Sequence, residues 1–213
     1  MDGIGLARRI VDEAAARAAE ISRRTGTSPC LATVLVGEDP ASATYVRMNG
    51  RGARRQASSP GISVLPATTT TTTTELIDTL ADLSPDPEVH GILLQHPCGR
   101  HIDERAAFEA IAPQKDVDGV TMRSFAAMSF GLPGFVSCTP NGIQRLLESY
   151  DVDLAGKHAV VVGRSAILGK PAGMLLLAKD ATVTYCHSRR PVGGRPGSGH
   201  RGSGCGAAPA DPR

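Results

Sequence analysis

The chain has 213 residues, 41% of them hydrophobic and 3% aromatic, which is enough for one large domain or two small ones. The net charge of +2 is unevenly spread, because residues 189–213 carry five arginines against one aspartate and leave the preceding residues at −2. A mildly acidic body without a basic stripe or a long apolar run argues against a nucleic-acid-binding or membrane-spanning protein.

The cysteines and the amino-terminal segment indicate a cytoplasmic location. The five cysteines are scattered without a CxxC pair, which favours reduced thiols over a disulfide framework or a zinc site. Residues 6–24 are rich in Ala, Arg and Glu with apolar residues at helical spacing. We therefore expect an amphipathic helix there rather than a signal peptide.

The next part of the chain alternates strand-like and helix-like segments. The apolar runs CLATVLV (30–36) and HGILLQ (90–95) predict buried strands. Between them we expect a helix from Ser42 or Ala43, interrupted at residues 49–61, a short strand near 62–66, and a helix capped by Thr74 and ending at Leu83. A helix capped by Asp103 and a turn leading into an extended segment at 115–120 follow.

The last part predicts a strand–helix–strand unit. Thr139 as N-cap and Pro140 at the first position predict a helix running to Tyr150. Strands at 159–162 and 181–186 flank a helix from about Lys170 to residue 177. The fold class is α/β. We expect domains at residues 1–137 and 138–188, followed by a disordered tail at 189–213, whose Gly- and Pro-rich composition cannot form a core.

The segment KHAVVVGRSAILGKP (157–171) combines a strand, a glycine turn and a helix start. Gly163 permits the sharp exit from the strand, and Gly169 permits close packing of the helix. The free N–H groups at the start of the helix would suit a phosphate. The spacing is not G-x-G-x-x-G, however, so the turn is either a dinucleotide site or a structural connection.

Polar residues near strand ends are candidates for chemistry. Gln95 ends a strand where open α/β sheets bind ligands, but it is equally a candidate for a satisfied structural amide. Asp118 lies in a glycine-flanked turn, where it projects into a cleft or only shapes the turn. Tyr45 could stack on a flat ring or pack as an ordinary helix tyrosine. His96 is a candidate base or a neutral structural residue.

These motifs together resemble one family. VLVGEDPASATYV, GILLQHP, KDVDG, SCTPNGI, VVVGRSAILGKPAGMLL and ATVTYCHS, in this order, resemble the bifunctional methylenetetrahydrofolate dehydrogenase/cyclohydrolases over residues 3–188. The resemblance implies an N-terminal α/β catalytic domain and a Rossmann-type NAD(P)-binding domain, incomplete here. It also implies a homodimer that binds tetrahydrofolate derivatives in the cleft between the domains.

Site residues follow from the same resemblance. Tyr45 would stack on the pterin, Gln95 would orient the catalytic lysine and Asp118 would hold the amino edge of the pterin. The family pattern is Tyr-x-x-x-Lys, but Asn49 stands at the lysine position and cannot carry a proton. The implied reaction is oxidation of 5,10-methylenetetrahydrofolate to the methenyl form, followed by hydrolysis to 10-formyltetrahydrofolate, the step that Asn49 would impair.

The cofactor implied is NADP. Gly163, Arg164 and Ser165 would line its phosphates, with Gly169 packing the helix behind them and Ser188 near the ribose. A Ser/Arg pair at 188–189, in place of the acidic residue typical of NAD enzymes, favours a 2′-phosphate.

The resemblance stops after Ser188. The family continues with a helix, a third nucleotide strand and a Pro-Gly-Gly-Val-Gly-Pro segment. Shifting the reading frame from Arg190 permits DLSAVVREADIVVAAVGRPQLIR, an amphipathic helix and a strand of the expected kind. A similar shift at 57–62 permits GIVARH. We therefore interpret the tail as out of frame, which resequencing would test. The alternative function is a non-catalytic remnant that binds a nucleotide or a partner.

Overall fold

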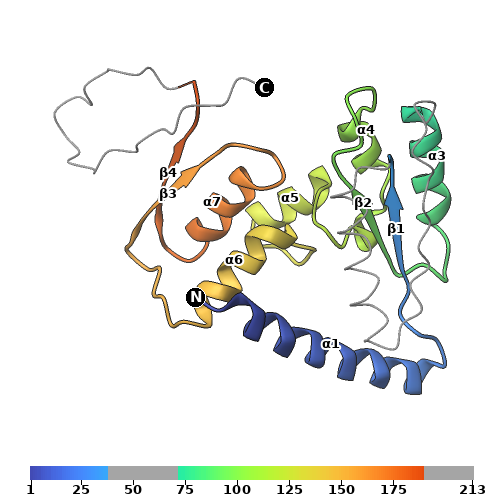
Figure 1. Cartoon of the computed structure of the whole chain (residues 1–213), viewed down its shortest axis with the longest axis horizontal. Coiled ribbons are helices and arrows are strands. Elements are labelled where there is room, and N and C mark those ends of the chain that lie inside the picture. The colour runs from blue at the N-terminus through green and yellow to red at the C-terminus, as the bar shows by residue number, and fades with distance from the viewer. Residues whose placement is uncertain (38–71, 190–213) are drawn as a thin grey trace. The chain divides into compact units, whose positions relative to one another are not determined.

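The computed structural model describes residues 1–37 and 72–189, which form two compact units divided after Cys138 (Figure 1). The expected helix with Tyr45 and Asn49, the expected strand near 62–66 and the tail from Arg190 lie outside these residues. The elements in chain order are α1 (Gly3–Thr25), β1 (Leu31–Leu35), α3 (Thr73–Leu83), β2 (Gly91–Gln95), α4 (Glu104–Glu109), the 3-10 helix η1 (Pro113–Lys115), α5 (Met122–Ser129), α6 (Cys138–Glu148), β3 (His158–Val162), α7 (Gly169–Leu177) and β4 (Thr182–Cys186).

The first unit is organised around two parallel strands. β1 pairs with β2 from Leu31 opposite Gly91 to Leu35 opposite Gln95. Both strands were predicted from continuous apolar runs, the pattern of strands covered on both faces. The buried side chains of the two strands form a core with buried side chains of α3 and α4, two helices that pack against each other. The buried apolar residues include Val34, Leu76, Leu80, Ile92, Leu94, Ala107 and Phe108.

The start of α3 corrects the prediction that Thr74 caps this helix. Thr72 is the N-cap: its hydroxyl accepts a hydrogen bond from the Glu75 N–H at 3.2 Å, and the Glu75 carboxylate accepts one from the Thr72 N–H at 2.7 Å. This is a capping box, which requires the acidic residue three positions after the cap. Thr74 directly precedes Glu75 and therefore cannot play this role.

Replacing Thr72 by alanine is expected to destabilise the first turn of α3 by about 1 kcal/mol, because an orphan helix N–H loses its acceptor. Amide hydrogen exchange in α3, followed by mass spectrometry, measures this change. Thr74→Ala is the matched control, since Thr74 is exposed and caps nothing. Equal acceleration of exchange in both variants would contradict the assignment of the cap.

The segment after η1 contains a helix that the sequence did not predict. α5 begins after Thr121, whose hydroxyl accepts from the Ser124 N–H at 3.1 Å. The predicted turn in residues 115–120 is present at residues 117–118, and Asp116 before it forms an isolated parallel bridge with Ile92, but α5 follows directly where the sequence predicted only an extended segment. α5 is only two turns long, too short for its apolar residues to establish a helical period.

The second unit contains the predicted strand–helix–strand arrangement. β3 and β4 pair in parallel from His158 opposite Thr182 to Val162 opposite Cys186 (Figure 1). α7 packs on the face that holds Tyr185, whose hydroxyl donates to the Lys170 carbonyl at 2.9 Å. On the other face of β3, Val160 and Val162 are 47% and 77% exposed.

The start of α6 also differs from the prediction. The helix begins at Cys138, so Pro140 occupies the third helical position rather than the first. The first turn has no intrahelical acceptor for its N–H groups, so proline is tolerated there too. The Gln144 side-chain amide donates to the Leu175 carbonyl at 2.5 Å, which attaches α6 to α7. Among the described helices, none has the length and apolarity to cross a membrane.

Candidate functional site

The carboxyl end of β2 carries the first predicted site residue. Gln95 is half-buried, and its side-chain amide nitrogen donates to the His96 carbonyl at 2.9 Å. Within the described residues, its side-chain oxygen accepts no hydrogen bond and is available to a partner. The His96 ring stands edge-on to Phe108, with the ring centroids 6.0 Å apart.

The turn that carries Asp118 is held by a second aspartate. Asp116 is fully buried, and its carboxylate oxygens accept from the Val120 N–H at 3.1 Å and the Thr121 N–H at 2.9 Å. Sequence reasoning missed Asp116, although the two aspartates of KDVDG were a signal that one shapes the turn while the other faces outward.

Residues 136–138 pack directly on the same turn. Gly119 has φ +66°, and a Cβ added there would lie 2.6 Å from the Ser137 nitrogen. The Ser137 hydroxyl donates to the Gly119 carbonyl at 3.1 Å, and the Cys138 N–H donates to the Asp118 carbonyl at 3.3 Å. The two segments therefore form one tight layer around Asp118.

The half-buried Asp118 carboxyl has an unusual environment. Burial raises its pKa above the ordinary range, and the nearby negative charge of Asp116 adds to this increase. A hydrogen bond from Cys138 and the charge of His96 act in the opposite direction. The structure thus brings the end of β2, Asp118 and the start of α6 together, whereas Tyr45 and Asn49 lie outside the described residues.

Lys115, the lysine within the same motif as Asp118, does not substitute for the missing family lysine. Its ammonium group donates to the Leu83 carbonyl at 3.5 Å and the Asp86 carbonyl at 2.5 Å. These contacts fasten η1 to the end of α3. The Lys115 side chain therefore stabilises the fold through these two hydrogen bonds.

The glycine turn of the second unit lies beside the end of β4. The Gly163 N–H donates to the Cys186 carbonyl at 2.8 Å, so the turn and the exposed Ser188 occupy the same edge of the sheet. Gly163 has φ +135°. A Cβ on Gly169 would lie 2.7 Å from the Gly163 carbonyl carbon and 2.8 Å from the Arg164 nitrogen, which explains the second glycine.

The donors available at this turn differ from the prediction. The Ser165 hydroxyl accepts from the N–H groups of Leu168 and Gly169 at 3.2 and 3.1 Å, the Ser165 carbonyl accepts from Lys170, and Pro171 has no N–H. The first turn of α7 therefore has no free donor. The N–H groups of residues 164–167 make no hydrogen bond within the described part of the chain, and they are the donors that can receive a phosphate.

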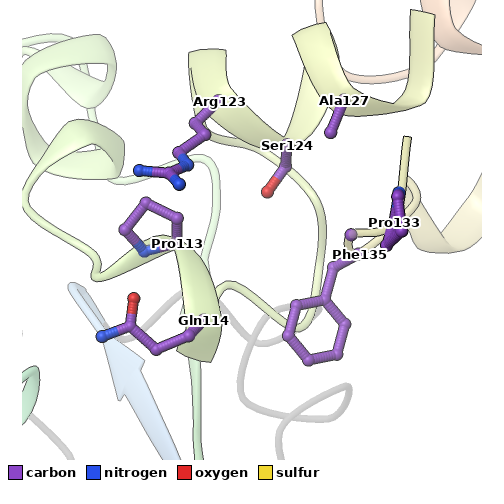
Figure 2. A pocket seen from close by; sticks show the side chains of 8 residues that line it. Pro113, Gln114, Arg123, Ser124, Ala127, Pro133 and Phe135 are labelled. Atoms are coloured by element: carbon purple, nitrogen blue, oxygen red, sulfur yellow. The ribbon is translucent and has the colours of Figure 1, made fainter. Parts of the chain in front are cut away.

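A separate hollow of about 520 Å³ lies in the first unit between η1, α5 and the loop before α6 (Figure 2). The hydroxyl of Ser124 points toward its interior, and the ring of Phe135 lies at one side (Figure 2). None of the predicted site residues lines it. The lining residues are Pro113, Gln114, Arg123, Ser124, Ala127, Pro133, Gly134 and Phe135.

Comparisons with known proteins cover both units. Residues 1–118 match the family model described as tetrahydrofolate dehydrogenase/cyclohydrolase, catalytic domain, and residues 137–192 match its NAD(P)-binding domain. Bifunctional protein FolD 1 of Streptomyces avermitilis is 82% identical over 193 residues, which cover 89% of this chain and 65% of that protein. Bifunctional protein FolD 1 of Salinispora arenicola is 61% identical, with coverage of 89% and 67%.

Solved structures agree with this assignment. The bifunctional FolD enzyme of Campylobacter jejuni has a TM-score of 0.84 and 36% identity, covering 89% of this chain and 66% of its own. The Trypanosoma brucei methylenetetrahydrofolate dehydrogenase-cyclohydrolase, solved with NADP cofactor and an inhibitor, has a TM-score of 0.84 and 32% identity, covering 90% and 65%. The chain spans about two thirds of the length of these relatives, and the resemblance read from its motifs is confirmed: it belongs to the tetrahydrofolate dehydrogenase/cyclohydrolase family.

Proposed function

We propose that the chain binds tetrahydrofolate derivatives and NADP, and acts in the oxidation of 5,10-methylenetetrahydrofolate to the methenyl form and its hydrolysis to 10-formyltetrahydrofolate. The observation that carries the proposal is the match to both family domains. In the first unit the candidate folate site is the turn of Asp118, which is held by hydrogen bonds with Asp116 and Ser137. In the second unit the candidate NADP site is the glycine turn with the N–H donors of residues 164–167.

Folate binding rests on the first unit. Asp118 is half-buried and, apart from the Cys138 thiol, its carboxylate has no side-chain hydrogen-bond donor within the described residues. It can therefore accept hydrogen bonds from the amino edge of a pterin. Tyr45 would stack on the ring, and Gln95, whose side-chain oxygen accepts no hydrogen bond from the described part of the chain, would orient the group at position 49.

NADP binding rests on the second unit. The N–H groups of residues 164–167 make no hydrogen bond within the described residues and are available to a phosphate, and Gly169 lets α7 pack closely against Gly163 and Arg164. Arg164 is exposed at the turn and would contact the NADP phosphates, and Ser188, exposed at the same edge of the sheet, would lie near the ribose. When bound, NADP accepts the hydride, and the role of the chain's own residues is to position it.

The hydrolytic step lacks its proton carrier in this sequence. A methenyl cation is already reactive toward water, so the protein needs to position the water and move one proton. Asn49 can donate a hydrogen bond but cannot transfer a proton as lysine can. We therefore propose that the cyclohydrolase activity of this chain is weak.

The proposed function is tested by the formation of NADPH from methylenetetrahydrofolate and NADP by the purified chain. Asp118→Asn is expected to lower kcat/KM by about tenfold to a hundredfold, because a charged acceptor is lost. Asp78→Asn, at an exposed acid on α3, is the matched control and should leave the rate unchanged. Folate binding without turnover would support the alternative of a non-catalytic binding protein.

The proposal includes a cytoplasmic location and a homodimeric assembly for the chain. A cytoplasmic location is supported by the scattered cysteines, and a homodimer is supported by the family resemblance. Light scattering on the purified chain tests the dimer.

The interpretation of residues 189–213 as an out-of-frame tail is supported by the end of the family match at residue 192. A resequenced gene whose intact frame encodes this tail would contradict it.

A further inference from the structure

Two charged side chains of α4 contact the segment that follows Asp118. The Arg105 guanidinium donates to the Val120 carbonyl at 2.8 Å and forms an ion pair with Glu109, one turn further along the helix. The same Glu109 carboxylate oxygen accepts from the Met122 N–H at 2.9 Å. The pair of Arg105 and Glu109, which we call the α4 ion pair, therefore binds the backbone between the Asp118 turn and α5.

The peptide group that joins Val120 to Thr121 is bonded on both sides. Its N–H, from Thr121, donates to the buried Asp116 carboxylate at 2.9 Å, and its carbonyl, from Val120, accepts from Arg105. The other oxygen of Asp116 accepts from the Val120 N–H at 3.1 Å. Because a peptide group is planar, a donor on one side and an acceptor on the other fix its orientation. Arg105 thus supplies the contact from α4 that completes this arrangement.

The guanidinium of Arg105 is itself held against the core of the first unit. Its central carbon lies 5.4 Å from the centroid of the Phe108 ring, and this ring is buried. A cation above an aromatic face is attracted by the charge distribution of the ring. The contact with Phe108 and the ion pair with Glu109 therefore leave the guanidinium aimed at Val120.

Stabilisation of α4 alone does not account for these contacts. The side chains of Arg105 and Glu109 are 44% and 29% exposed, and ion pairs this exposed contribute little to stability. In addition, a basic residue four positions before an acidic one is the less favourable order within a helix. The hydrogen bonds to Val120 and Met122 lie outside the helix, and a charge-assisted hydrogen bond to a backbone group is the stronger interaction.

We propose that Arg105 is a positioning residue of the folate site, which acts through the Val120 peptide group to hold the Asp118 carboxylate where it receives the amino edge of the pterin. Glu109 orients the guanidinium. The inference rests on the proposed function for the identity of the ligand. The hydrogen bonds of the α4 ion pair belong to the free protein and can be tested without folate.

The first experiment measures amide hydrogen exchange in the free protein by NMR, residue by residue. Arg105→Gln is expected to accelerate exchange at residues 120–122 by about tenfold, because a charge-assisted hydrogen bond to this backbone is lost. Arg123→Gln is the matched control, since Arg123 is exposed on α5 and its side chain makes no hydrogen bond or ion pair within the described residues. Unchanged exchange at residues 120–122 in Arg105→Gln would overturn the proposal.

The second experiment measures the affinity for folic acid in two backgrounds. Arg105→Gln is expected to weaken binding by about tenfold in the otherwise unchanged chain, and by less than about twofold in Asp118→Asn, where no carboxylate remains to be positioned. Arg105→Lys keeps a charged donor and should bind with intermediate affinity. Arg123→Gln should bind like the unchanged chain.

The two backgrounds separate positioning from a general loss of stability. An equal loss of affinity in both would show that Arg105 acts independently of Asp118 and would contradict the proposal. Normal folic acid binding by Arg105→Gln would overturn this inference and leave the proposed function intact. A wild-type chain that binds no folic acid would instead overturn the proposed folate site, and with it the role of Arg105 in substrate binding.

Discussion

Replacing Asn49 by lysine is expected to raise the rate of methenyltetrahydrofolate hydrolysis by about a hundredfold, with a much smaller change in the NADP-dependent dehydrogenase rate. Asparagine has no proton that it can transfer, and a positioned acid or base contributes about 10²- to 10⁴-fold to such steps. Position 49 is four residues after Tyr45, a spacing that places two side chains on one face wherever the backbone is helical.

The matched control for this prediction is Asn49→Gln, which changes length without adding a transferable proton. The loss of methenyltetrahydrofolate absorbance, corrected for the uncatalysed reaction, measures the hydrolysis. Equal rates for the lysine and glutamine variants would show that position 49 does not carry the proton in this chain. A lysine variant that is faster only in the dehydrogenase assay would contradict the assignment of the two steps.

Replacing Gly169 by alanine is expected to weaken NADP binding by more than about tenfold and to destabilise the second unit by about 2 kcal/mol. The added Cβ would lie 2.7 Å from the Gly163 carbonyl carbon and 2.8 Å from the Arg164 nitrogen. These are backbone atoms, so the turn itself would have to open, and overpacking of this kind costs about 1–3 kcal/mol. The same movement would displace the donors of residues 164–167.

Gly142→Ala provides the control for Gly169→Ala. Gly142 lies within α6, and nothing stands within 4 Å of the Cβ that would be added there. Alanine in a helix is favoured over glycine by about 0.5–1 kcal/mol, so this variant should be slightly more stable and bind NADP normally. Calorimetric titration with NADP and thermal unfolding measure both effects. Normal NADP affinity in Gly169→Ala would show that α7 can move without disturbing the site.

Much of the fold could be predicted because the relevant signals are local. The strands at β1, β2, β3 and β4 follow from short apolar runs, and Asp103 as the cap of α4 follows from its position before the helix. Prediction was less accurate where local signals were short or repeated. Seven consecutive threonines do not by themselves distinguish Thr72 from Thr74, and the capping box with Glu75 decides between them.

The donors at the glycine turn required the tertiary structure. A strand, two glycines and a helix start predict a phosphate site, but they do not show which N–H groups remain free. The Ser165 hydroxyl folds back on the N–H groups of Leu168 and Gly169, and this contact depends on the actual path of the turn. The N–H groups that remain available to an anion are therefore those of residues 164–167 rather than those at the helix start.

The family, the α/β class and the glycine turn could be read from the amino-acid sequence, because ordered motifs and apolar periods are properties of contiguous residues. The surroundings of Asp118 could be seen only in the folded chain. Cys138 and Ser137 reach its turn from a segment about 20 residues away, which leaves no local pattern, and which of the two aspartates of KDVDG is buried is seen only in the folded chain. Hydrogen bonds between distant segments and the desolvation of a carboxyl arise only when the chain has folded.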